Sequence, residues 1–288
     1  MQDTLERFIF EQAPVRGEIV QLGSAYQEVL NRHGYPPVLQ KLIGELMTAA
    51  TLLSATLKFD GTLVMQLHGH AAVRLIVVEV TSQNTIRAMA RWEGDIPDVS
   101  LGELLGEGRF VITLDPTEGE AYQGIVGFEP GQSVAQIIEH YMQSSEQLQT
   151  RLWLACTDGK AAGLLVQKLP AGHGDPDAWD RVQKLSETVT AEELLDLPPR
   201  DLLYRLFHQE EVRVFDPSTP TFACTCSRER VGGMLQMVGK AEIDSVMAEK
   251  GQVEVTCEFC GQGYQFDQVD VAQLFGGHGT DHAGTQLH

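Results

Sequence analysis

The chain has 288 residues, of which 43% are hydrophobic, so it can bury a sizeable core and is not disordered as a whole. Its 40 acidic and 21 basic residues give a formal net charge of −19, and this field repels nucleic-acid phosphates, which speaks against general nucleic-acid binding. The N-terminus lacks the basic and apolar regions of a secretory signal, and no apolar stretch is long enough to span a bilayer, so we expect a cytoplasmic protein without membrane contacts.

Residues 1–175 are predicted to form one α+β domain. A helix at 38–57 is apolar on nearly all sides, which is typical of a helix that protein covers on several sides. A second helix begins at Ser133, with Gln136 as its capping-box partner. Strands are indicated by runs rich in β-branched and large apolar residues, at 63–68, 73–80, 85–91, 108–114, 124–128, 152–156 and 161–169. Together these elements predict a layered domain of β-sheets around a buried helix.

Residues 176–222 are predicted to form a helical linker, because a run rich in Gly and Pro separates them from the first domain. Thr190 opens one short helix as a capping box, and Pro198-Pro199 opens the next. Isolated helices this short are marginal in water, so the linker should be metastable and should dock on the first domain. The side chains expected to dock are Leu194, Leu195, Leu202, Leu203, Leu206 and Phe207.

Four of the five cysteines lie in a small predicted domain at 223–275, as the pairs Cys224/Cys226 and Cys257/Cys260. In a reducing compartment such pairs are metal ligands or redox groups rather than structural disulfides. Two pairs about thirty residues apart suit one tetrahedral ion, so we expect one Zn²⁺ per chain in the reduced form, held by all four thiolates. A domain of about fifty residues also needs such a ligand to fold securely.

The surroundings of the four cysteines can be predicted in part. A helix is expected to start at Val231, and a strand at 253–256 should lead into the second pair. Arg228 and Arg230 are close enough in sequence to offset some of the thiolate charge. Residues 276–288, rich in Gly and His, are predicted to be disordered.

The chemistry of this site leaves two interpretations open. Four sulfur ligands leave no position for a water molecule, so zinc-dependent hydrolysis is not expected. Thiolates are the form that oxidants attack, and cysteines two or three positions apart can form a disulfide locally, which would release the ion. The residues by themselves are compatible with a redox switch and with a purely structural zinc.

The cysteine motifs resemble those of the heat-shock protein 33 family of redox-regulated chaperones. The first reads Cys224-Thr-Cys226-Ser227, and the second reads Cys257-Glu-Phe-Cys260-Gly-Gln-Gly-Tyr264. The resemblance extends over nearly the whole chain and includes Trp92-Glu-Gly and the runs at 162–170 and 199–207.

The resemblance implies an ATP-independent holding chaperone of the stress response, not an enzyme. In this family the zinc-bound, reduced protein is inactive. Oxidation would form the disulfides Cys224–Cys226 and Cys257–Cys260 and release zinc, after which the metal domain and linker lose structure. The uncovered surface would bind unfolding client proteins, and the oxidised chain would form a homodimer. The linker residues implied in client binding are Leu202, Leu203, Leu206 and Phe207.

Two other functions stay open at this point. The chain could be a thiol-disulfide oxidoreductase that uses Cys257 and Cys260, although this pair lacks a thioredoxin-like setting. It could also be an interaction module whose zinc is only structural. Cys156 is expected to be a buried small hydrophobic residue rather than a nucleophile. His68 and His70 lack a nearby third ligand and are interpreted as structural.

Overall fold

The computed structural model describes residues 3–96, 99, 101–129, 131–170, 175 and 177–276. The chain divides into two compact units, Met1–Ala223 and Cys224–His288. Within the described ranges, no helix has the length and apolar character that crossing a bilayer requires. The tail predicted to be disordered lies outside these ranges, apart from Gly276, which ends a helix.

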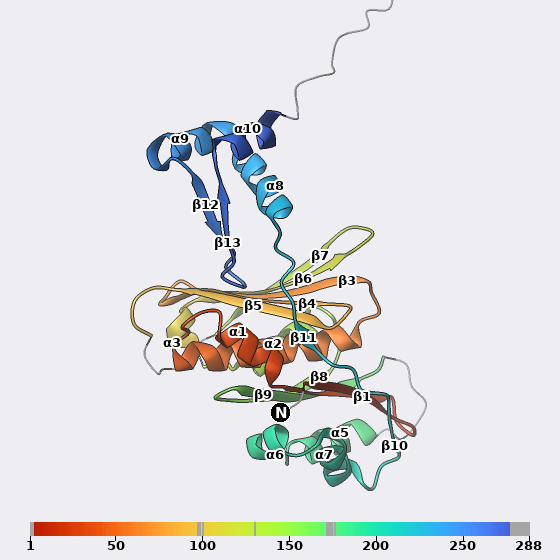
Figure 1. The fold of residues 1–288 in the computed structure, drawn as a ribbon. Coiled ribbons are helices and arrows are strands. Elements are labelled where there is room, and N and C mark those ends of the chain that lie inside the picture. The colour runs from red at the N-terminus through yellow and green to blue at the C-terminus, as the bar shows by residue number, and fades with distance from the viewer. Residues whose placement is uncertain are drawn as a thin grey trace, which may run out of the picture. The chain divides into compact units, whose positions relative to one another are not determined.

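The first unit is built in layers, with a long helix between two sheets (Figure 1). The first sheet has the strand order β10 (Val212–Val214), β1 (Thr4–Phe10), β2 (Val15–Leu22), β9 (Lys160–Lys168) and β8 (Thr150–Thr157). The second sheet has the order β11 (Thr221–Phe222), β5 (Thr85–Trp92), β4 (Val73–Thr81), β3 (Gly61–His68), β6 (Gly108–Pro116) and β7 (Tyr122–Phe128). The predicted α+β fold of β-sheets around a buried helix is therefore confirmed.

The central helix is α2 (Pro37–Thr56), close to the predicted range. Pro37 occupies its first turn, where a missing N–H costs nothing. Its side chains are buried on almost every side, because both sheets pack against it. Shorter helices complete this layer: α1 (Ser24–Leu30), α3 (Leu101–Leu105) and α4 (Val134–Ser144). The capping box predicted at Ser133 and Gln136 is present at the start of α4.

Three short helices cover the outer face of the first sheet: α5 (Ala178–Ser186), α6 (Ala191–Asp196) and α7 (Pro199–Phe207) (Figure 1). Thr190 and Glu193 form the expected capping box before α6. We call the apolar contact between these helices and the sheet the linker cluster. Its buried members include Phe8, Phe10, Val15, Ile19, Leu164, Val166, Trp179, Val182, Leu194, Leu195, Leu202, Leu203, Leu206 and Phe207. At 2% exposure, Phe207 lies with its ring centroid 6.0 Å from that of Phe8 and 5.1 Å from that of Phe10.

Polar contacts fix the position of these helices on the sheet. Gln21, on β2, donates from Nε2 to the carbonyl oxygens of Leu194 and Leu197, both at 2.8 Å. Arg200, on α7, lies 3.0 Å from the carboxylate of Glu6, whose side chain is only 8% exposed. Because buried polar groups are costly to leave without partners, these contacts favour one register of the helices over a sliding apolar contact.

A buried carboxyl group lies on the opposite face of the first sheet. Glu18 is 2% exposed, and its Oε2 atom has no hydrogen-bond partner. Burial raises its pKa to about 8, against the opposing effect of the positive charges of Arg16 and Arg7. Folding therefore holds a proton on Glu18 that the unfolded chain, with a pKa near 4.5, releases.

We expect replacement of Glu18 by Gln to stabilise the protein at alkaline pH. Between pH 4.5 and about 8 the unfolded chain gains stability from ionising this carboxyl, and the folded protein does not. The native protein should thus lose about 1.4 kcal/mol of stability per pH unit across this window from Glu18 alone. Urea unfolding of both proteins at pH 5 and pH 7.5 measures this effect, and a difference that is independent of pH would contradict a protonated Glu18.

The second unit contains α8 (Arg228–Val238), α9 (Lys240–Lys250), β12 (Val253–Thr256), β13 (Gly263–Phe266) and α10 (Gln268–Gly276). Its buried apolar core is small and consists of Val231, Leu235, Ile243, Val253, Phe266 and Val271. The predicted start of the first helix at Val231 is wrong by one turn. Ser227 caps the helix by accepting the backbone N–H of Arg230 at 3.2 Å, so α8 begins at Arg228.

Candidate metal centre

The first cysteine pair lies in an extended segment directly before α8. Ser227, which follows Cys226, ends this segment by capping the helix, so the two thiols are held at a fixed distance from the helix start. Arg228 has partners other than the cysteines: it donates to the carbonyl oxygen of Gln265 at 2.7 Å and pairs with Asp270 at 2.7 Å. Arg230 donates to the hydroxyl of Thr225 at 2.6 Å.

The second cysteine pair lies in the turn between β12 and β13, which are paired from Val253–Phe266 to Thr256–Gly263. The N–H of Cys257 donates to the carbonyl of Gln262 at 2.9 Å, and the N–H of Gly261 returns to the carbonyl of Cys257 at 2.8 Å. Gly261 has a φ of 73°, a left-handed conformation that suits glycine. This tight turn directs the thiols of Cys257 and Cys260 to the same side.

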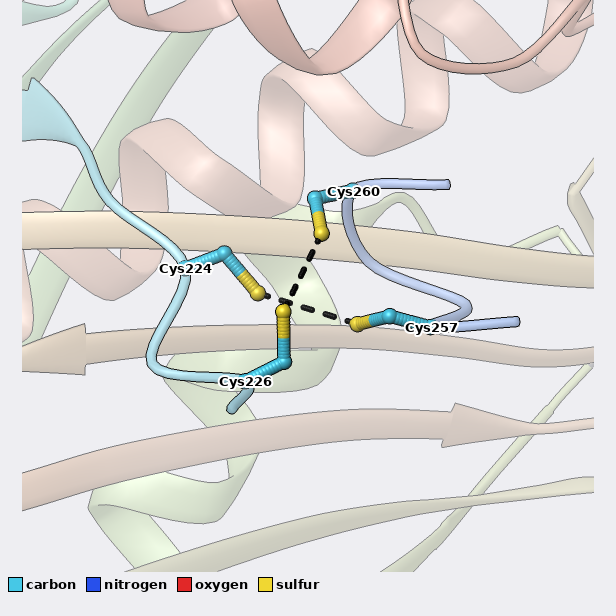
Figure 2. Close-up of side chains that lie close together, drawn as sticks. All are labelled: Cys224, Cys226, Cys257 and Cys260. Carbon is cyan, nitrogen blue, oxygen red and sulfur yellow. Dashed lines mark hydrogen bonds between the residues drawn. The ribbon is translucent and has the colours of Figure 1, made fainter. Parts of the chain in front are cut away.

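The four sulfur atoms point toward one another (Figure 2). All four lie within 4.8 Å of one another, with 3.7 Å between the sulfurs of Cys224 and Cys257 and 3.3 Å between those of Cys226 and Cys260. A zinc–sulfur bond of about 2.3 Å in a tetrahedron places the sulfurs about 3.8 Å apart. The cluster therefore has the dimensions of a four-thiolate metal site. In this structure the four cysteines form no disulfide, and each is half-buried.

The pKa values of the thiols are spread widely within this cluster. Although desolvation acts to raise it, the pKa of Cys226 falls to about 7, because the hydroxyl of Tyr264 and the neighbouring thiols donate hydrogen bonds to its sulfur. Burial and the nearby sulfurs raise the pKa of Cys260 to about 12, and burial also raises the pKa of Cys257. One thiolate can thus form near neutral pH, and four together need a cation to balance their charge.

The structure adds one residue to the predicted site. The hydroxyl of Tyr264, on β13, lies 3.1 Å from the sulfur of Cys226 and donates to it. The sequence placed Tyr264 in the second cysteine motif without indicating a role. Such outer partners orient metal ligands and adjust their basicity. With four sulfurs converging on one point, the arrangement can hold a metal ion without an open coordination position, or it can be oxidised to disulfides.

Cys156 is remote from this cluster in the sequence and belongs to the core of the first unit. Its sulfur lies 3.4 Å from the hydroxyl of Tyr26 and packs directly against the backbone of Gly44. Burial raises the pKa of this thiol to about 11, so little thiolate is present at neutral pH. The contacts agree with the expected role in packing.

We expect the variant Cys156→Ser to bind metal and respond to peroxide as the native protein does. The hydroxyl can replace the hydrogen bond to Tyr26 but is smaller and more polar, so thermal stability should fall modestly, by about 1 kcal/mol. Zinc content, peroxide activation and thermal unfolding of the variant are the measurements. If the variant differed from the native protein in its response to peroxide, Cys156 would have a part in that response.

The histidines considered as ligands have other surroundings. The Nε2 atom of His68 lies 2.7 Å from the side-chain oxygen of Gln66, and burial lowers the pKa of His68. Among the described residues, the group of side chains that lie close enough together to hold a metal ion consists of the four cysteines and includes no histidine.

Comparison with known proteins gives a consistent result. The family model described as Hsp33 protein matches residues 3–267. The 33 kDa chaperonin of Chromobacterium violaceum is 51% identical over 276 residues, covering 95% of this chain and 94% of that protein. The 33 kDa chaperonin of Methylobacillus flagellatus is 48% identical over 279 residues, with 96% and 95% covered. The crystal structure of the 33 kDa chaperonin from Thermotoga maritima shares the fold, with a TM-score of 0.82 at 21% identity over 95% of this chain and 98% of that one.

Proposed function

Because the chain belongs to the Hsp33 protein family, we propose that it is a redox-regulated, ATP-independent holding chaperone of the cytoplasm and not an enzyme. It binds unfolding proteins after its metal-ligating cysteines are oxidised. The observation that carries the proposal is the convergence of four thiols within 4.8 Å in a unit whose apolar core is small. Such a unit depends on its ligand for stability, so its thiol chemistry controls its folding.

In the resting state, Cys224, Cys226, Cys257 and Cys260 hold one Zn²⁺ per chain. Zinc suits this donor set because soft thiolates in a tetrahedron are its usual structural ligands. A Zn²⁺ ion would compensate two of the four thiolate charges, and the hydrogen bond from Tyr264 would stabilise part of the charge that remains on Cys226. The division into a core at 1–175, a linker at 176–222 and a zinc domain at 223–275 is part of this proposal.

Oxidation converts the four thiolates into two disulfides, which we assign as Cys224–Cys226 and Cys257–Cys260 from the family resemblance. Each disulfide forms one S–S bond and releases two electrons. Two molecules of hydrogen peroxide accept the four electrons and, with four protons, become four molecules of water. Disulfide sulfur is a poor ligand for zinc, so the oxidised cysteines would no longer hold the ion, and the second unit would lose its main stabilising contribution.

The linker helices then leave the first sheet. They are short, and their stability comes from the linker cluster rather than from their own hydrogen bonds. Their release uncovers Leu202, Leu203, Leu206 and Phe207 together with the sheet face beneath them. A surface of this kind binds proteins that expose apolar side chains, and it also accounts for dimerisation of the oxidised chain.

We expect one zinc ion per reduced chain and a severe loss of zinc in Cys260→Ser. A hydroxyl in place of a thiolate removes one of four ligands from a closed site, so affinity should fall by more than a hundredfold. Elemental analysis measures the zinc content of the native protein and of Cys260→Ser, each purified under reducing conditions. Cys156→Ser is the matched control. A zinc-free native protein or full retention of zinc in Cys260→Ser would disprove the assignment.

Light scattering of a heat-unfolding client tests the proposed function directly. The oxidised protein should suppress aggregation, and the reduced protein should not. Equal suppression by both forms would indicate an interaction module with a purely structural zinc. Turnover in an insulin-reduction assay would instead indicate a thiol-disulfide oxidoreductase that uses Cys257 and Cys260.

A further inference from the structure

The segment that follows the linker helices covers the outer edge of β1. Leu5 exchanges both backbone hydrogen bonds with Ser218, at 2.9 Å each. Farther along the strand, the carbonyl of Arg7 accepts the N–H of Phe215 at 2.9 Å. The N–H of Glu11 donates to the carbonyl of Glu211, also at 2.9 Å, and Ile9 lies opposite Arg213. The edge is therefore occupied from Leu5 to Glu11 by residues 211–218.

The side chains of this covering segment alternate between two environments. Val212 lies opposite Phe10 and Val214 opposite Phe8, and both valines pack against the linker cluster. Arg213, between them, is exposed and pairs with Glu11 at 3.0 Å. The segment thus binds as an extended strand that supplies main-chain hydrogen bonds to β1 and places every second side chain on an apolar surface.

We infer that β1 is a client-binding edge, which β10 occupies in the resting protein. The inference rests on the proposed release of the linker, because β10 follows α7 in the chain and shares its apolar cluster. Once released, β1 presents a row of N–H and C=O groups next to the rings of Phe8 and Phe10. An exposed edge of this kind recruits an extended strand, in which main-chain bonds give affinity and alternate side chains give selectivity.

The occupant is therefore an extended polypeptide segment with apolar side chains at every second position. The chain's own Val212-Arg213-Val214 shows that such a segment fits. Its regular strand is only three residues long, and the pairing shifts by one residue between Arg7–Phe215 and Leu5–Ser218, so a client strand in a single register can pair with β1 more regularly. Unfolded proteins offer many segments of this pattern, which agrees with binding that does not depend on one sequence.

Main-chain recognition can be tested with a labelled peptide that copies residues 208–218. Fluorescence anisotropy measures its binding to the oxidised, full-length protein. In the resting pairing the amides of Arg213 and Phe215 face β1, whereas those of Val212 and Val214 face away from it. N-methylation at Arg213 and Phe215 should weaken binding at least about tenfold, since two hydrogen bonds are lost. The matched control, N-methylated at Val212 and Val214, should change it less than about threefold.

Equal effects of the two methylation patterns, or no binding of the peptide, would overturn the inference. Hydrogen exchange gives a second measurement: the amides of Leu5, Ile9 and Glu11 should lose protection on oxidation and regain it when an unfolded client is added. If these amides regained protection at higher protein concentration without any client, the edge would instead bind a second copy of the chain. That result would also overturn the inference. If the oxidised protein suppresses client aggregation while the peptide results fail, the chaperone function stands and strand addition does not.

Discussion

Replacing Phe207 by Asp should make the reduced, zinc-bound protein an active holding chaperone. The ring of Phe207 is buried between Phe8 and Phe10, at the centre of the linker cluster. Removing a buried aromatic ring costs about 3–5 kcal/mol, and a buried carboxylate adds a further penalty. A destabilisation of this size shifts the equilibrium between docked and released linker more than a hundredfold.

The activity of Phe207→Asp is measured by light scattering of an unfolding client under reducing conditions, and zinc analysis verifies that the metal is retained. Leu206→Asp, at a second buried position of α7, should behave in the same way. Tyr204→Asp is the matched control, because Tyr204 lies on the same helix and is 74% exposed. This substitution should leave the linker docked and the reduced protein inactive. If the linker of Phe207→Asp were displaced and the variant were still inactive, release of the linker would not be sufficient for client binding.

The sequence predicted the centre of the fold well, for a physical reason. The long apolar helix and the strands that cover it carry their signal locally, because most positions of α2 and about every second position of β3 to β5 meet the same apolar core. Whether these segments form a helix or a strand therefore depends little on which distant residue provides each contact. The boundaries of α2 are accordingly within one residue of the prediction.

Strands β1 and β2 were missed, because their polar residues find partners far along the chain. Glu6 is buried through its contact with Arg200, and Gln21 through the carbonyl groups of Leu194 and Leu197 in and directly after α6. Neither partner is visible from the local pattern, which contains too many charges for a typical half-buried strand. The short strands β10 and β11 exist only as additions to the edges of β1 and β5, so their own sequences carry little signal.

The convergence of the four cysteines could be predicted, because two close pairs at this spacing can supply four ligands to one point. That they hold zinc stays a prediction. The role of Tyr264 could not be predicted, since it depends on the pairing that places β13 beside the first cysteine pair. The assignment of disulfides and the metastability of the linker stay predictions. Both concern a state of the protein other than the one described.

Oxidation should open the linker while the core of the first unit stays folded. Loss of a structural zinc removes about 10–16 kcal/mol of apparent binding free energy from the second unit, far more than the six buried apolar residues of that unit can replace. The strand β11, which pairs with β5, ends two residues before Cys224, so the anchor of the linker is joined directly to the first ligand. Segments of low local stability open first, and the short helices α5 to α7 are of this kind.

Hydrogen exchange by mass spectrometry on the reduced and the oxidised protein tests this coupling most directly. We expect residues 178–222 to lose their protection on oxidation together with residues 224–276, while α2 and β9 stay protected. The oxidised sample must suppress client aggregation in the same preparation, so that structure and activity are compared in one state. A linker that stays protected in the oxidised, active protein would contradict the account, even with the zinc site confirmed.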